Sequence, residues 1–236
     1  MVKNKTRAAY IQQIEELDGL VSRLGEIVVA AVRATGHALG EADEAAARGV
    51  VEGRGSADRL HRSVEDSCMG LMLLQQPLAG DLRLVTASFR MVSDLARIEE
   101  MAVDIAQLAP DVIGKRVPPT ITGDLAMLSA QVATMVESAV DAFSRSDADA
   151  ATAVFPLDNG VDASFGKIRA MIVDNLRSDD SFADVAAELL MIAKYYERMG
   201  DHAQQVADWA IFRTTGLYRG RPMGEDSLDQ ADWSAR

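Results

Sequence analysis

Four acidic side chains in the second half of the chain are spaced as a metal site would need. Asp158 precedes Asp162 by four residues, and Glu197 precedes Asp201 by four. Residues four apart lie on the same face of an α-helix, about one turn from each other. If two such helices are antiparallel neighbours, the four carboxylates meet in one groove and repel each other unless a cation is bound. Oxygen ligands favour iron, manganese, magnesium or calcium over metals that prefer thiolates.

The same spacing is common on helix faces that simply meet water. A pair of acids at positions i and i+4 is more often a solvated face than a pair of ligands. Spacing alone therefore leaves both interpretations open, and the elements that carry the acids have to be considered.

These acids belong to a sequence that contains an internal duplication. With an offset of 104, apolar residues of the first half match those of the second: Val21 with Leu125, Leu24 with Leu128, and Val28 with Val132. Further on, an offset of 101 pairs Arg97, Ala102 and Ala106 with Arg198, Ala203 and Ala207. Solenoid repeats are shorter, at roughly 20–50 residues. The pattern therefore predicts two copies of a larger helical unit.

Both units are expected to open with a long helix, because apolar residues recur at spacings of three and four. The stripes comprise Ile14, Leu17, Val21, Leu24, Val28 and Ala31 in the first unit, and Leu125, Leu128, Val132, Met135 and Ala139 in the second. Further helices are expected near 41–74, 79–108, 119–145, 147–177 and 180–214, with a proline-containing linker over 110–119. We predict an all-α fold of six long helices in two tandem, duplicated three-helix bundles (8–110 and 119–216), followed by a flexible polar tail (217–236).

The composition supports a helical protein without a strong attraction for nucleic acid. Hydrophobic residues make up 48 % of the chain and aromatic residues only 5 %, which suits close-packed helices better than a β-sandwich. The formal net charge of −12 argues against a nucleic-acid partner. No apolar run approaches a membrane span, and Cys68 is the single cysteine, so a reducing cytoplasm is the expected location.

Three segments resemble the PhoU family of phosphate-uptake regulators. Lys194 to Ala203 (KYYERMGDHA) resembles the family's ERIGDHA signature, and Leu74 to Val85 (LQQPLAGDLRLV) resembles its LQQPVARDLR segment. Ser93 to Ala106 resembles the first-unit counterpart of ERIGDHA. The similarity runs from about Tyr10 to Gly216 and so covers nearly the whole chain.

The resemblance implies metal sites, some of them multinuclear, on E(D)xxxD motifs from two helices of each bundle. In the second unit it assigns the metal to Asp158, Asp162, Glu197 and Asp201, with iron, manganese, magnesium or zinc as the candidate ions. The first unit departs from the pattern, because Arg54 stands in place of Asp158 and Ala96 in place of Glu197. Only Asp58 and Glu100 remain there as ligand candidates, so we expect the first unit to hold little or no metal.

The resemblance further implies a cytoplasmic adaptor that is not an enzyme and that forms a homodimer. Its expected partners are the ATPase subunit of the phosphate ABC transporter and the sensor histidine kinase of the phosphate two-component system. Such a protein would restrain phosphate uptake and the phosphate-starvation response, touching the membrane only through its partners.

Two alternatives come from other classes of protein. A ferritin-like metal oxidoreductase would need Glu-x-x-His motifs, and the one acid at that offset before a histidine is Asp58, ahead of His61. A metal-free dimeric helical scaffold would use the acids only for solubility. We also expect His202 to be a packing group, and Arg97 and Arg198 to pair with carboxylates of opposing helices.

Overall fold

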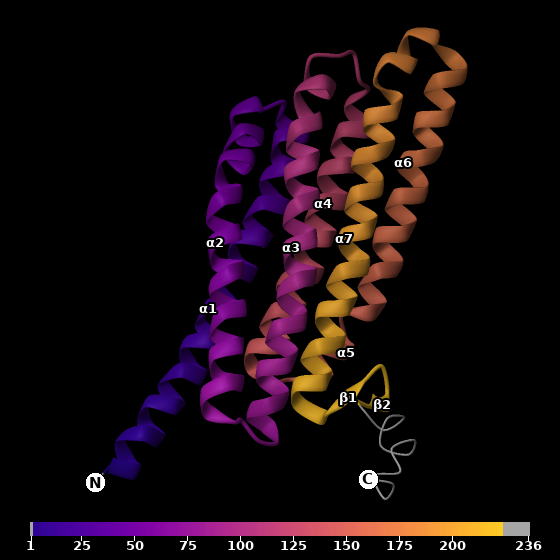
Figure 1. Cartoon of the computed structure of the whole chain (residues 1–236). Coiled ribbons are helices and arrows are strands. Elements are labelled where there is room, and N and C mark those ends of the chain that lie inside the picture. The colour runs from indigo at the N-terminus through magenta and orange to yellow at the C-terminus, as the bar shows by residue number, and fades with distance from the viewer. Residues whose placement is uncertain (1, 224–236) are drawn as a thin grey trace, which may run out of the picture.

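The computed structural model describes residues 2–223 and confirms an all-α architecture with six long helices (Figure 1). These are α1 (Val2–Glu41), α2 (Glu44–Gln75), α3 (Gly80–Ile113), α4 (Pro119–Arg145), α6 (Asp158–Ser178) and α7 (Ala183–Thr215). Three short helices, α5 (Ala148–Thr152), η1 (Phe155–Leu157) and η2 (Asp180–Phe182), lie between them. Two short strands, β1 (Leu217–Tyr218) and β2 (Arg221–Pro222), follow α7 as an antiparallel hairpin.

Local sequence explains where several helices begin and end. The Asp43 side chain accepts hydrogen bonds from the amides of Ala45 and Ala46 and so caps α2. Asp147, its counterpart at the offset of 104, caps α5 by accepting from the Ala150 amide. Gly216 ends α7 in the left-handed conformation, at φ 82°, which glycine adopts without steric cost.

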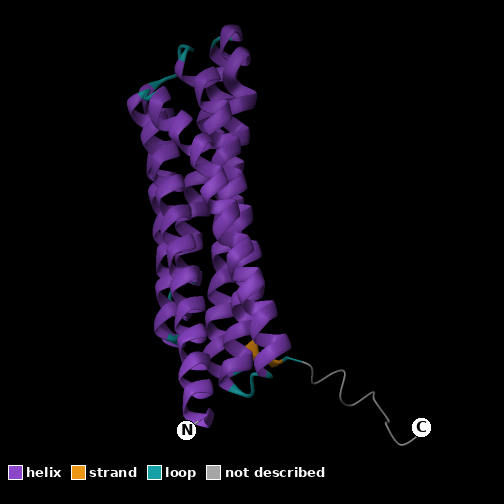
Figure 2. Cartoon of the chain, turned by 60° about the vertical axis from the view of Figure 1, so that its left-hand side comes forward, coloured by secondary structure: helices purple, strands orange, loops and turns teal. Residues whose placement is uncertain are grey.

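The helices run side by side along one long axis (Figure 2). Helices α1, α2 and α3 form the first unit, and α4, α6 and α7 form most of the second. The units meet through two extensive contacts, α1 against α4 and α3 against α7. Figure 1 shows α2 at one side of the molecule and α6 at the other, so the four remaining long helices make up its centre.

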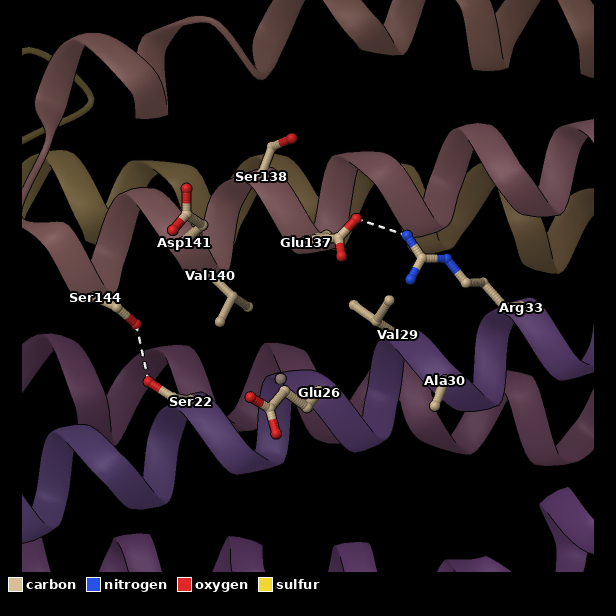
Figure 3. A pocket seen from close by; sticks show the side chains of 11 residues that line it. Ser22, Glu26, Val29, Ala30, Arg33, Glu137, Ser138, Val140, Asp141 and Ser144 are labelled. Carbon is tan, nitrogen blue, oxygen red and sulfur yellow. Dashed lines mark hydrogen bonds and ion pairs between the residues drawn. The ribbon is translucent and has the colours of Figure 1, made fainter.

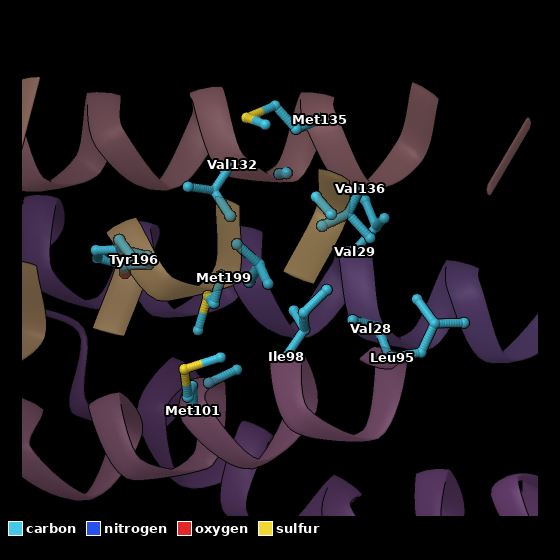
Figure 4. Packing of buried hydrophobic residues seen from close by; sticks show 14 of the residues in the cluster. Val28, Val29, Leu95, Ile98, Met101, Val132, Met135, Val136, Tyr196 and Met199 are labelled. Carbon is cyan, nitrogen blue, oxygen red and sulfur yellow. The ribbon is translucent and has the colours of Figure 1, made fainter. Parts of the chain in front are cut away.

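One continuous hydrophobic core joins the two units. Val28, Ile98, Val136 and Met199, from four different helices, are all buried in the same cluster (Figure 4). The two three-helix units are therefore not independent bodies with separate cores.

Close packing along the seam between α1 and α4, and buried hydrogen bonds of α1 with α4 and α7, hold the two units together. A Cβ on Gly25 would lie 2.6 Å from a methyl of Val140, so only glycine permits this separation. Nearby, Ser129 donates a hydrogen bond to the Val32 carbonyl across the seam. The hydroxyl of Tyr196, which is fully buried on α7, donates to the Thr35 hydroxyl on α1.

Two proline positions differ from the sequence prediction. Pro110, expected to open the linker, lies inside α3, which continues to Ile113 because Ala109 and Val112 still pack into the core. The helix expected over 147–177 is broken into α5, η1 and α6. Pro156 lies within η1 and lacks the amide that a continuous helix needs at that point.

The residues directly after α7 also differ from the flexible tail that was expected from Leu217. Tyr218 stacks on Trp209 with ring centroids 4.2 Å apart, and Arg219 donates to the Asp208 carboxylate at 3.0 Å. These contacts fold the hairpin back onto α7. The rest of the expected tail, 224–236, lies outside the described residues. Within residues 2–223, no helix combines the length and apolarity that crossing a bilayer requires.

Candidate metal centre

The four candidate ligands of the second unit come from two packed helices. Asp158 is the first residue of α6, directly after η1, and Asp162 follows one turn later. Glu197 and Asp201 lie in the middle of α7, which packs against α6. The break at Pro156 thus places a carboxylate at the N-terminus of α6, where the helix dipole favours negative charge.

Gly200 of α7 leaves space for the Asp158 carboxylate of α6. A Cβ at Gly200 would lie 3.0 Å from Asp158 Oδ1 and 3.4 Å from a Val161 methyl. Because glycine carries no side chain, the Asp158 carboxylate can lie against the backbone of α7. This contact places the Asp158 carboxylate beside the α7 helix, in the groove that α6 and α7 form, one residue away from Asp201 in the sequence of α7.

The acids of the two helices influence the pKa of Asp158 and of Asp201. Burial raises the pKa of Asp158, and the negative charges of Asp162 and Asp201 raise it further. Partial desolvation also raises the pKa of Asp201, as does Glu197, while the charge of Lys194 acts in the opposite direction. Asp158 and Asp201 are therefore harder to ionise beside the other acids, and a bound cation would relieve this effect.

Lys194 supplies an internal positive charge at this groove. Its Nζ lies 2.6 Å from Glu197 Oε2 and 5.4 Å from the centroid of the Phe165 ring. The ion pair neutralises one of the four acids, so the groove keeps a surplus of negative charge.

The donors fit a hard divalent cation by type, although they do not form a closed shell as they stand. Across residues 2–223, no three acidic, histidine or cysteine side chains lie close enough together to hold an ion. The four acids lie on the two packed helices α6 and α7, so a cation that binds all four would have to draw their side chains together.

The first unit has a different set of residues at the equivalent place. Asp58 and Glu100 both raise the pKa of a third acid, Glu99. Glu100 is already paired, since its Oε2 lies 2.6 Å from Arg97 Nη1 on the same helix. Arg54, the counterpart of Asp158, brings a positive charge that lowers the pKa of Glu99.

Glu99 is the residue that sequence reasoning missed. At the offset of 101 it stands where the second unit has Gly200, so the position that is open in one unit is filled by a carboxyl in the other. Its side chain is buried, with the whole residue only 4 % exposed, and burial raises its pKa to about 7. The substitution of glycine by glutamate within a duplicated motif was visible in the sequence.

The remaining candidates have mostly structural surroundings. His202 Nδ1 lies 3.0 Å from Asp94 Oδ1, so this histidine connects α7 to α3 instead of facing the acids of its own unit. The expectation that Arg97 pairs with an opposing helix is wrong, because its partner Glu100 is on α3 as well. Arg198 forms no ion pair within the described part of the chain.

A separate cavity lies elsewhere in the molecule. It has a volume of about 980 Å³ and lies along the seam of α1 and α4 (Figure 3). Ser22 and Ser144 share a hydrogen bond at 3.0 Å across it, and Arg33 pairs with Glu137 at 2.6 Å. None of the four candidate ligands of the second unit lines it.

Comparisons with known proteins agree with the duplicated architecture. A model of the PhoU domain matches the chain twice, over residues 21–109 and 125–210. The "phosphate-specific transport system accessory protein PhoU homolog" of Pseudomonas aeruginosa is 28 % identical over 204 residues, which cover 86 % of this chain and 84 % of that protein. The homolog from Clostridium acetobutylicum is 27 % identical over 212 residues, covering 89 % of this chain and 96 % of that one.

Solved structures show the same fold. The crystal structure of PhoU from Pseudomonas aeruginosa matches with a TM-score of 0.83 at 27 % identity, covering 88 % of this chain and 100 % of that one. The phosphate transport system regulatory protein PhoU from Streptococcus pneumoniae matches with a TM-score of 0.80 at 20 % identity, over 89 % and 98 %. With both units matched by the domain model, the chain belongs to the PhoU family.

Proposed function

We propose that the protein is a cytoplasmic regulator of phosphate uptake and homeostasis that works without catalysis. The observation that carries this proposal is the match of both units to the PhoU domain, together with relatives named as accessory proteins of the phosphate-specific transport system. Those relatives are named as accessory proteins rather than as enzymes.

In this proposal the protein connects two partners. One is the ATPase subunit of the phosphate ABC transporter and the other is the sensor histidine kinase that controls the starvation response. A homodimer of the double bundle would hold both in contact and keep the response off when phosphate is plentiful. Long helices with a shared core suit this role, because packed side chains can transmit the effect of a partner bound at one face to another face.

The negative charge of the chain disfavours direct binding of phosphate. With a formal net charge of −12 and a surplus of carboxylates in its groove, the protein repels free phosphate. The signal therefore arrives through protein contacts, with phosphate itself detected at the transporter.

A divalent cation at Asp158, Asp162, Glu197 and Asp201 is part of the proposal. It would relieve the repulsion that raises the pKa of Asp158 and Asp201 and would tie α6 to α7. The first unit, with Arg54 at the equivalent of Asp158 and Ala96 at that of Glu197, would hold little or no metal.

A metal-free scaffold is the second candidate, favoured by the lack of three converging donors within the described residues. It predicts the same partners but no cation dependence. Melting curves with manganese(II) and with chelator separate the two candidates. A cation that binds only the folded state raises the melting temperature, and the scaffold predicts identical curves.

A deletion strain tests the regulatory role. Without the gene, a starvation-response reporter should be active in phosphate-rich medium, and the wild-type gene should silence it. Purified protein should also retain the transporter ATPase and the kinase in separate binding assays. A reporter that stays silent after deletion, with neither partner retained, would contradict the proposal.

A further inference from the structure

A cleft between α1 and α2 leads from the surface to a buried carboxyl group. It has a volume of about 280 Å³ and is lined by small and aliphatic side chains of both helices, with Glu99 of α3 at its base. The small lining residues are Ala30, Ala31 and Ala34 on α1, and Ala46, Gly49 and Gly53 on α2.

The glycines of α2 face open space. A Cβ built on Gly49 or on Gly53 would meet no other atom within 4 Å. The lining on α2 runs from Ala46 to Gly53, a stretch that spans about 10 Å along the helix. An extended four-carbon chain fits within that length.

Glu99 has no partner of its own in residues 2–223. The residue is 4 % exposed, no hydrogen bond or ion pair joins its carboxyl to another described side chain, and it lines the cleft. Asp58 and Glu100 add negative charge that acts on Glu99, and Arg54 adds positive charge. A largely buried carboxylate that lines a cleft can accept a hydrogen bond from a group that enters it, and a donor that carries positive charge is favoured there.

We propose that this cleft binds an aliphatic ammonium group, with the alkyl chain against the alanines and glycines and the ammonium at Glu99. The apolar lining excludes a hydrated metal ion, and no third donor is close enough to complete a metal shell within the described residues. The ammonium can come from a free alkylamine or from a lysine side chain of a partner protein. This inference concerns the first unit and does not depend on metal in the second.

Calorimetric titration of the full-length protein with n-butylammonium chloride tests the proposal, with n-butanol as the uncharged probe of the same shape. We expect binding of the ammonium at millimolar concentration and weaker binding of the alcohol. Glu99→Gln should weaken ammonium binding by about ten- to hundredfold, the effect of losing one charge-assisted hydrogen bond. Arg54→Gln, which removes a competing cation, should strengthen it.

A space-filling variant provides an independent check. Gly49→Leu places a side chain in the cleft and should abolish binding. Its matched control is Gly166→Leu on α6, where a Cβ likewise meets nothing within 4 Å, and binding should be unchanged. Thermal melts of all variants confirm that each one is folded.

A second probe, Nα-acetyl-lysine amide, distinguishes the two sources of the ammonium. Binding of both probes supports a site for free amines and side chains alike, and binding of the lysine derivative alone supports a lysine of a partner. Absence of binding for both probes, or equal binding to wild type and Glu99→Gln, would overturn the proposal.

Discussion

Replacing Glu99 by glutamine should remove a pH dependence from the stability of the bundle. The side chain is buried on α3, beside Asp58 and Glu100, and its pKa is raised from 4.5 to about 7. Glutamine keeps the shape of the side chain but cannot ionise. The comparison between the two proteins therefore isolates the cost of ionising this one group.

The sign follows from proton binding in the two states. Between pH 4.5 and 7 the folded protein holds the Glu99 proton and the unfolded chain has released it, so stability falls as the pH rises. The relative stability that Glu99 contributes is fully present below pH 4.5 and is lost above about pH 7. A change in pKa from 4.5 to about 7 corresponds to about 3 kcal/mol, most of it between pH 5 and 8.

Urea unfolding at a series of pH values measures this difference. From pH 5 to pH 8, the free energy of unfolding of wild type should fall by about 2–3 kcal/mol more than that of Glu99→Gln. The control is Glu15→Gln, a change at an exposed position of α1, which should follow wild type. If the Glu99→Gln and wild-type curves stay parallel across this range, the carboxyl is not buried in the way described.

Three further substitutions test the packing. Gly36→Ala should lower the free energy of unfolding by about 1–3 kcal/mol in urea titrations, because the new Cβ collides with the Ser129 side chain. An unchanged urea midpoint would refute the close approach of α1 and α4. Tyr196→Phe should cost about 1–2 kcal/mol, since the buried Thr35 hydroxyl loses its donor, and a neutral effect would argue against that bond. Gly200→Ala should weaken cation binding in calorimetry while the protein stays folded, and undiminished affinity would show that the α6 carboxylate does not need this space.

The fold could be predicted because its signals are local or repeated. The stripe from Ile14 to Ala31 and its counterpart from Leu125 predict long helices, and the offset of 104 predicts two units. Helix boundaries at prolines were less predictable. Pro110 stays helical because buried neighbours hold the last turn of α3, whereas Pro156 breaks its helix. Tertiary packing decides whether a helix continues through a proline or ends there, and the sequence near each proline does not show which occurs.

The site was predictable as a set of residue types but not as a set of contacts. The acid pairs lie on the packed helices α6 and α7 and influence the pKa of Asp158, while their role as metal ligands stays a prediction. The bond of His202 to Asp94 depends on which helices meet, and a single sequence does not show that. Lys194 and Glu197 lie three residues apart on α7, a spacing that allows an ion pair, but side-chain rotamers decide whether the pair forms. Glu99 is different, because its exchange with Gly200 was readable once the two units were aligned.

Metal content of the full-length protein after dialysis against manganese(II) tests the central claim most directly. Elemental analysis should find bound metal in wild type and in the double variant Asp58→Asn with Glu100→Gln. The double variant Asp158→Asn with Asp201→Asn should lose it, because these two carboxylates come from the two helices that form the groove. Equal metal in both variants, or none in wild type, would contradict a cation site in the second unit.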